Sequence, residues 1–144
     1  MPEGLKKLSL KKEVTRMLFL NQIRDWIKGF DAAENYYIGK MNDKEKSLGV
    51  FQLSPRPPTR AIGQQSSYEV RRISIKLHWN KNQNESERAA YELYRQLRAV
   101  RSFDIDDTHV YFIDLLQAEP VSIDTDDNGV YEWVIEFEIY YERK

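Results

Sequence analysis

The run Asp124-Thr125-Asp126-Asp127-Asn128-Gly129 contains residue types that could bind calcium. In loops that open D-x-D-x-N-G, oxygen atoms at alternate positions converge on one ion. The match then fails, because the twelfth position is Ile135, where such a loop needs a bidentate glutamate, and the residues that follow alternate as a strand does. We therefore interpret this run as a surface turn.

A second acidic group comprises Asp104, Asp106 and Asp107, with His109 close by. Carboxylates and an imidazole could together hold a divalent metal, which would favour a small metal-dependent hydrolase. However, the spacing of these residues matches no established metal site. The only other histidine is His78, and the sequence has neither a nucleophile motif nor a glycine-rich phosphate loop. The sequence therefore predicts a protein that is not an enzyme and that has no metal, cofactor or catalytic residues.

Two groups of charged residues are candidates for binding a partner rather than for catalysis. Arg56, Arg60, Arg71 and Arg72 could form a basic patch beside a proline-rich loop, able to contact phosphates or an acidic surface. Glu132, Glu136 and Glu138 would form an acidic stripe along one face of a strand. In both groups solvated surface charge is the simpler interpretation, so these residues are predicted only as interface candidates.

Composition indicates a globular domain of ordinary size. The 144 residues are 41% hydrophobic and 31% charged, which favours one domain over residues 1–144, with residues 1–9 as a frayed leader. No apolar run is long enough to cross a membrane, and the absence of cysteine excludes disulfides. With 22 basic and 23 acidic residues, the chain lacks the positive excess of a dedicated duplex-DNA binder. Its nine tyrosines, six phenylalanines and three tryptophans favour a β-rich core, or an obligate oligomer.

The first half of the chain predicts one helix, two strands and a long loop. Ser9 can cap a helix over about residues 10–28, and we expect Gly29 to end it in a left-handed conformation. Strands are expected over residues 34–39 and 47–53, separated by a polar turn at 42–44. A loop rich in proline, serine and glutamine then covers residues 54–67.

The second half predicts further strands and a second helix. Residues 68–79 form a strand with a bulge or bend near Arg71-Arg72, and residues 85–98 form a helix whose buried stripe holds Ala89, Ala90, Leu93, Tyr94 and Leu97. A largely apolar strand over 110–116 is expected to be central and covered on both sides. A strand over 120–124, a turn at 127–129 with positive φ at its central positions and an alternating strand over 130–141 complete the chain.

These elements predict an α+β domain with a mainly antiparallel (mixed) sheet of about five to six strands packed with two helices. Two segments carry a resemblance to a known family: YIGKM (37–41) running on to SLGVF (47–51), and AEPV (118–121) followed by DDNGVYEWVIEFEIYYE (126–142). With the strand ISIKLHW and the helix SERAAYELYRQL between them, they resemble the bacteriophage minor capsid proteins of the head–tail joining region of siphophages. The resemblance spans most of the chain.

The resemblance implies a fold similar to tail-terminator proteins, which cap the tail tube as rings, typically of six copies. It also implies a structural virion protein of a tailed phage or prophage that forms or completes a ring at the head–tail joint. Its partners would be copies of itself, the tail-tube protein and the head-side connector or stopper, with DNA passing unbound and no membrane involved. The chain would reside in the virion, and in the host cytoplasm during assembly.

Two site hypotheses and one alternative function accompany this interpretation. The stripe Glu132/Glu136/Glu138 would line the channel and repel DNA phosphates, and the loop over residues 55–65 would contact a neighbouring subunit or the connector. The alternative is a monomeric protein- or nucleic-acid-binding module that uses residues 54–72 and their arginines. A stopper or adaptor position at the joint is also open.

Overall fold

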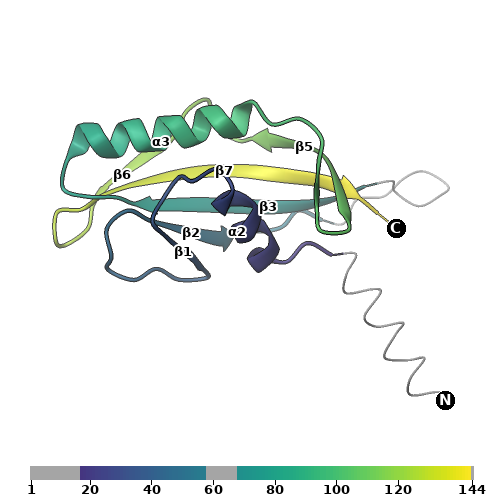
Figure 1. Cartoon of the computed structure of the whole chain (residues 1–144), viewed down its shortest axis with the longest axis horizontal. Helices are drawn as coiled ribbons and strands as arrows, with labels where there is room; N and C mark the ends of the chain where they lie inside the picture. The colour runs from purple at the N-terminus through teal and green to yellow at the C-terminus, as the bar shows by residue number, and fades with distance from the viewer. Residues whose placement is uncertain (1–16, 58–67, 144) are drawn as a thin grey trace, which may run out of the picture.

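The computed structural model describes residues 17–57 and 68–143. Within these ranges the chain forms two helices and one seven-stranded mixed sheet of order β1-β2-β3-β7-β5-β4, with β6 also paired to β7 (Figure 1). The predicted α+β class is confirmed, with a slightly wider sheet than expected. In chain order the elements are α2 (Leu20–Lys28), β1 (Asn35–Ile38), β2 (Ser47–Gln52), β3 (Tyr68–His78), α3 (Gln83–Arg98), β4 (Phe103–Ile105), β5 (Thr108–Leu115), β6 (Val121–Thr125) and β7 (Tyr131–Glu142).

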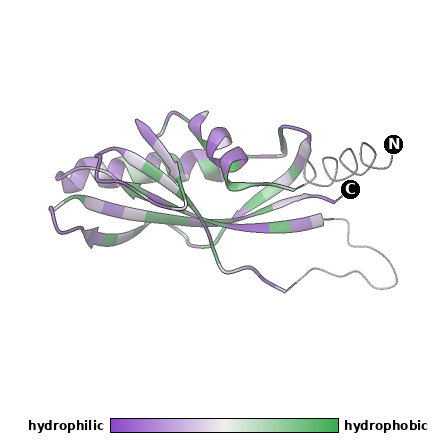
Figure 2. Ribbon diagram, turned by 90° about the horizontal axis from the view of Figure 1, so that it is seen from below, coloured by the Kyte–Doolittle hydropathy of each residue, from purple (hydrophilic) through white to green (hydrophobic). Residues whose placement is uncertain are grey.

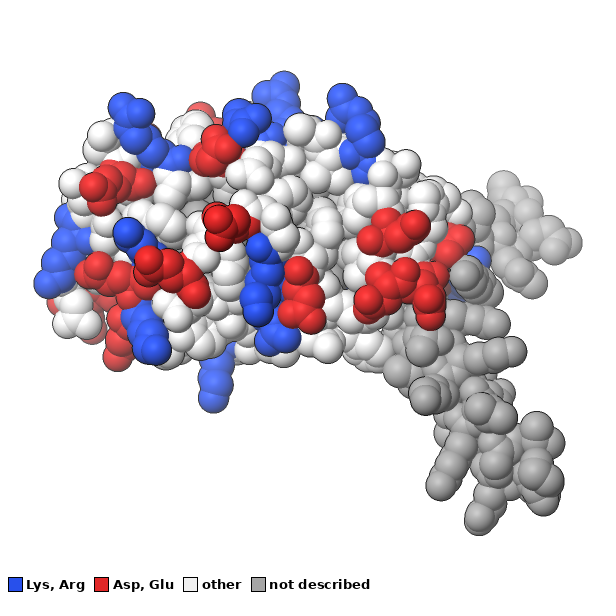
Figure 3. Space-filling model, viewed as in Figure 1, with Lys and Arg blue, Asp and Glu red and all other residues white. Residues whose placement is uncertain are grey.

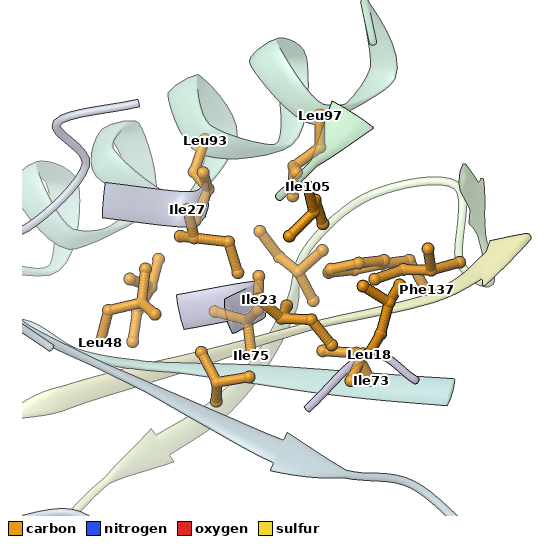
Figure 4. Close-up of a cluster of buried hydrophobic side chains, with 14 of the residues drawn as sticks. Leu18, Ile23, Ile27, Leu48, Ile73, Ile75, Leu93, Leu97, Ile105 and Phe137 are labelled. Carbon is orange, nitrogen blue, oxygen red and sulfur yellow. The ribbon is translucent and has the colours of Figure 1, made fainter. Parts of the chain in front are cut away.

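Both helices lie on the same side of the sheet (Figures 1 and 2). Their apolar stripes meet the inward side chains of the central strands in one core, part of which Figure 4 shows. Trp26 of α2 stacks on Phe103 at 4.5 Å between ring centroids, and the indole N–H of Trp133 donates to Ser86 Oγ of α3 at 3.0 Å. Fully buried members of the core include Ile23, Ile27, Leu48, Val50, Ile73, Ile75, Ala90, Leu97, Phe137 and Ile139.

The end of α2 differs from the sequence-based expectation. Gly29 has φ −63°, a right-handed value, so it does not end the helix through a left-handed conformation. Instead the N–H groups of Gly29 and Phe30 donate to carbonyls three residues back, which tightens the last turn, and Asp31 is the residue that turns left-handed, at φ 53°. The predicted start of the helix, at Ser9, lies outside the described residues.

The long antiparallel pair β3–β7 is the centre of the sheet. Its register runs without interruption from Tyr68 opposite Glu142 to His78 opposite Glu132, so the bulge predicted near Arg71-Arg72 is wrong. Tyr68 and Val70 simply lie on the face of the sheet opposite to the core. β1 pairs with β2 in parallel, and this pair makes the sheet mixed.

The strands beyond β7 correct two further expectations. β4 was not predicted; it forms a tight hairpin with β5 through Asp106, whose φ is 51°. β5 is not covered on both sides, because Tyr111 and Phe112 are 41% and 48% exposed. β5 and β6 pair in succession along the same edge of β7, each antiparallel to it.

The hairpin between β6 and β7 lies where it was predicted, but its backbone conformation differs from the prediction. Gly129 adopts the expected positive φ, 81°, whereas Asn128 is not among the residues with positive φ and Asp124, before the turn, has φ 68°. Both the N–H of Asn128 and that of Val130 donate to Oδ1 of Asp126 at 2.9 Å. The aspartate side chain therefore holds the turn closed.

Candidate functional site

The face of the sheet opposite the helices is uncovered by any helix of the described ranges, and we call it the open face (Figure 2). Alternate residues of the two central strands point to it, because side chains alternate across a strand. These residues are Tyr68, Val70, Arg72, Ser74, Lys76 and His78 of β3, and Glu132, Val134, Glu136, Glu138 and Tyr140 of β7. All three glutamates of the predicted acidic stripe thus share this face.

Glu138 is the centre of a charged cluster on the open face. Its side chain is fully buried, and its Oε2 lies 2.7 Å from Nε of Arg56 and 2.9 Å from Nε of Arg72. Oε1 accepts hydrogen bonds from Arg56 at 2.9 Å and from the hydroxyl of Tyr140 at 3.1 Å. We call these four residues the Glu138 clamp. Two arginines and a hydroxyl give the buried carboxylate the charge compensation that it needs away from water.

Backbone bonds hold the clamp in place. The N–H of Leu53 donates to the carbonyl of Arg72 at 3.0 Å, which continues the contact between the chain leaving β2 and β3. The guanidinium of Arg72 also donates to the carbonyl of Ser54 at 2.6 Å. Consequently the segment after β2 stays beside the open face, and Arg56 can cover Glu138. Sequence analysis named both arginines and the glutamate separately but had no signal that joined them.

The other two glutamates of the stripe also have partners. Glu132 Oε2 lies 2.9 Å from Nδ1 of the buried His78 and 3.3 Å from Nζ of Lys76, and Glu136 accepts from the side-chain amide of Gln117 at 2.8 Å. The predicted stripe is therefore interleaved with cations. Arg56 and Arg72 both contact Glu138 and Lys76 contacts Glu132, whereas Glu136 is bound by a neutral amide.

The remaining arginines of the predicted basic patch do not join the clamp. Arg71 lies on the core side of β3, opposite Ile139, and its Nε is buried without a hydrogen-bond partner. Arg60 lies outside the described residues. The structure therefore brings Arg56 and Arg72 together, and it separates Arg71 from both.

Aromatic rings border the clamp on the open face. Phe112 of β5 stacks on Tyr140 with ring centroids 4.5 Å apart, and Tyr68 lies 5.6 Å from the same ring. Burial, reinforced by the hydrogen bond to Glu138, raises the pKa of Tyr140. Because Phe112 is 48% exposed and Tyr68 37%, these rings present an apolar surface beside the buried charge. Sequence analysis missed Phe112, since the apolar run around it indicated a doubly covered strand.

The candidate metal-binding residues have structural contacts instead. Asp126 accepts the backbone bonds of the β6–β7 turn, and those bonds, chiefly the one from Val130, lower its pKa. Asp104 lies 2.8 Å from Nδ1 of His109, and Asp106 accepts from the side chain of Gln22 at 2.8 Å. Within residues 17–57 and 68–143, no three histidine, aspartate or glutamate side chains are arranged to hold a metal ion.

A groove of about 650 Å³ lies between α3 and the residues that precede β6. Arg88, Arg95 and Arg98 of α3 line it, and across it the hydroxyl of Tyr91 donates to Glu119 at 3.1 Å. Figure 3 shows basic side chains along this helix and acidic ones where the β4–β5 hairpin lies. Both the groove and the open face offer contact surfaces of mixed charge.

The geometry describes a protein of strands, aromatic surface and paired charges, and the comparison with protein families agrees with it. Residues 17–143 match the model of the bacteriophage tail terminator protein family. The chain belongs to this family, and it is accordingly a structural phage protein of the head–tail region and a component of the virion. No curated protein matches the sequence. Among the helices of the described residues, none is both long and apolar enough to span a membrane.

Proposed function

We propose that this protein completes the phage tail by forming a ring, of six copies, at the joint between tail and head. One side of the ring would contact the tail-tube protein and the other the head-side connector or stopper. The family match over residues 17–143 carries this proposal, because it includes every helix and strand of the described structure. A ring also suits a sheet with edge strands, β1 and β6, that have no partner strand on their outer side in the described structure.

We further propose that the open face points into the channel, with Glu132, Glu136 and the Glu138 clamp lining it. Because Glu132 and Glu138 are paired with cations, the electrostatics of this lining would differ from those of a bare acidic wall. A lining of balanced charge would attract DNA phosphates weakly, so the genome could pass without binding. A structure of assembled tails in which Glu136 points outward would overturn this orientation.

The loop over residues 55–65 is proposed to contact the neighbouring subunit or the connector; its residues 58–65 lie outside the described residues. The clamp supports this, because Arg56 fastens the start of the loop to the open face. The alternative, a monomeric binding module that uses the arginines of residues 54–72, would need those cations for its ligand. Arg56 and Arg72 already neutralise Glu138, which counts against it.

The first test is the absolute mass of the purified protein by light scattering behind a sizing column, over a concentration series. The same measurement is repeated after mixing with purified tail-tube protein. A discrete ring-sized species in either sample would support the proposal. A protein that stays monomeric in both samples, and that does not bind tails in a pull-down, would overturn it.

A further inference from the structure

Two edge strands on opposite sides of the sheet have no partner strand on their outer side in the described structure. One is β1, and the other is β6. At the other end of the sheet, β4 pairs with only the first three residues of β5, and Phe103 of β4 stacks on Trp26 of α2. An uncovered strand edge exposes backbone N–H and C=O groups that can pair with another chain.

The two free edges lie on the same transverse row of the sheet. Following the register across it, Tyr36 pairs with Leu48, Leu48 with Leu77, Leu77 with Trp133, and Trp133 with Ser122. The row thus crosses β1, β2, β3, β7 and β6 in order, and both of its ends are open. Because both open ends belong to the same row, copies of this strip of sheet could be joined end to end with their rows aligned.

Strand direction decides how such ends would join. β1 is parallel to β2, while β2–β3, β3–β7 and β6–β7 are antiparallel, so β6 runs opposite to β1. If the axis of the ring runs along the strands, rotation about that axis leaves the direction of each strand the same in every copy. The junction between β6 of one copy and β1 of the next would therefore be antiparallel, which is the more stable pairing.

Side chains at the two edges favour the junction of β6 with β1 over a symmetric, twofold junction in which β6 would pair with β6. Ile38 on β1 is 36% exposed, and Val121 and Ile123 on β6 are 41% and 42% exposed, so both edges leave apolar surface in water. Residues 116–130 carry four acidic residues and no basic one, whereas residues 34–46, which contain β1, carry three acidic residues and three lysines. Pairing β6 with β6 would set acidic residues together, and pairing β6 with β1 would not.

We propose that β6 of one copy pairs with β1 of the next, so that the transverse row closes into a continuous band of sheet around the ring. This inference rests on the proposed ring function and adds the contact that would build the ring. The bulge in β6 between Ser122 and Thr125 limits regular pairing to its first residues, which makes the junction short and fixes its register. In a closed band one face of the sheet is enclosed, as proposed for the open face.

Disulfide trapping tests the junction directly, because the natural chain has no cysteine. Single-cysteine variants Tyr37→Cys and Ile38→Cys on β1, and Ser122→Cys and Ile123→Cys on β6, sample both side-chain parities of each edge. Cross-linking requires Cα atoms within roughly 4.4–6.8 Å, so it reports a paired strand and not mere proximity. Arg88→Cys, exposed on α3, is the matched control, and melting temperatures verify that each variant is folded.

We expect oxidation of mixed β1 and β6 variants to give a covalent dimer, while neither variant alone gives one. A chain carrying one cysteine on each edge should lose its monomer band and form a ladder that ends at the closed ring. Efficient self-cross-linking of a β6 variant alone would show a twofold junction and would overturn the proposal. Arg88→Cys should cross-link with no β1 variant; equal yields there would remove the support that the mixed dimer gives.

The mass measurement separates failure of the junction from failure of the ring. Oxidation is therefore carried out on the full chain, alone and with tail-tube protein, in the samples whose mass is known. A ring-sized species that none of the four β1–β6 cysteine combinations can cross-link would overturn the junction and leave the proposed function standing. Monomer in both samples, without cross-links, would overturn both.

Discussion

Nε of Arg56 lies 2.7 Å from Oε2 of Glu138, a carboxylate with 0% of its side chain exposed, although Arg56 itself is 54% exposed. The two residues are 82 positions apart in the chain. Their contact fastens the segment after β2 across the face of the sheet that bears no helix. The consequences of removing either partner differ, because loss of Glu138 removes the shared partner of Arg56, Arg72 and Tyr140, whereas loss of Arg56 leaves Arg72 and Tyr140 on the carboxylate.

Substitution of the clamp residues should reveal this asymmetry. Glu138→Ala and Arg72→Ala should each lower the free energy of unfolding by about 3 kcal/mol, because each leaves part of a buried pair uncompensated. Arg56→Ala should cost less, about 1–2 kcal/mol, since Arg72 and Tyr140 still bind the carboxylate. Urea denaturation measures all three. The exposed pair Arg95–Glu92 supplies the control, and an Arg95→Ala effect as large as that of Glu138→Ala would contradict the argument.

The hydrogen bond between helix α3 and strand β7 should also be measurable. Ser86→Ala removes the acceptor of the Trp133 indole N–H in a buried position and should cost about 1–3 kcal/mol. Ser102→Ala, at an exposed position, should leave the free energy of unfolding nearly unchanged. Equal effects of the two substitutions in urea denaturation would show that the Trp133 N–H finds another partner.

The turn between β6 and β7 predicts a pH dependence. Backbone bonds from Val130 and Asn128 lower the pKa of Asp126 in the folded protein. Its stabilising contribution is therefore fully present above the unfolded aspartate pKa of about 3.9 and is lost as the pH falls through the lower folded value. Asp126→Asn should make stability less sensitive to acid in that window. An unchanged pH profile of the free energy of unfolding would contradict this.

Gly129 gives a test of backbone conformation without crowding. Its φ is 81°, and an added Cβ would meet nothing within 4 Å, so Gly129→Ala tests the left-handed conformation alone. We expect a loss of about 1–2 kcal/mol in thermal or urea denaturation. Gly29→Ala is a comparison at a right-handed glycine, where an added Cβ would lie 3.1 Å from the carbonyl of Trp26. An unchanged free energy of unfolding for Gly129→Ala would contradict the assignment of strain.

Local alternation was enough to predict the central strand and its two faces. In β7 the residues Trp133 and Phe137 point to the core, and Glu132, Glu136 and Glu138 point away, as the sequence predicts. The same reasoning failed in β3, where apolar residues of the wrong parity indicated a bulge. Tyr68 and Val70 are instead accommodated on the open face, where Tyr140 packs beside Tyr68. The alternation within one strand cannot reveal that the face away from the core also carries aromatic side chains.

The charged cluster shows a second limit of sequence reasoning. Alternation assigned Glu138 to the face without helices, and that face is ordinarily wet. Its burial depends on Arg56, which reaches it only because Arg72 holds the carbonyl of Ser54. The prediction for the end of α2 was wrong for a related reason. A glycine permits a left-handed conformation but does not require one, and Asp31 adopts that conformation two residues later. Three-residue β4 is too short to produce a periodic signal.

β7 is paired along its whole length by β3 on one side, but on the other side by β5 and then β6, with residues 116–120 between them. Insertions or deletions at that break would leave every pair of the β3–β7 ladder unchanged. The rim of the sheet could therefore change in length without moving any residue of the hydrophobic core between the central strands and the two helices.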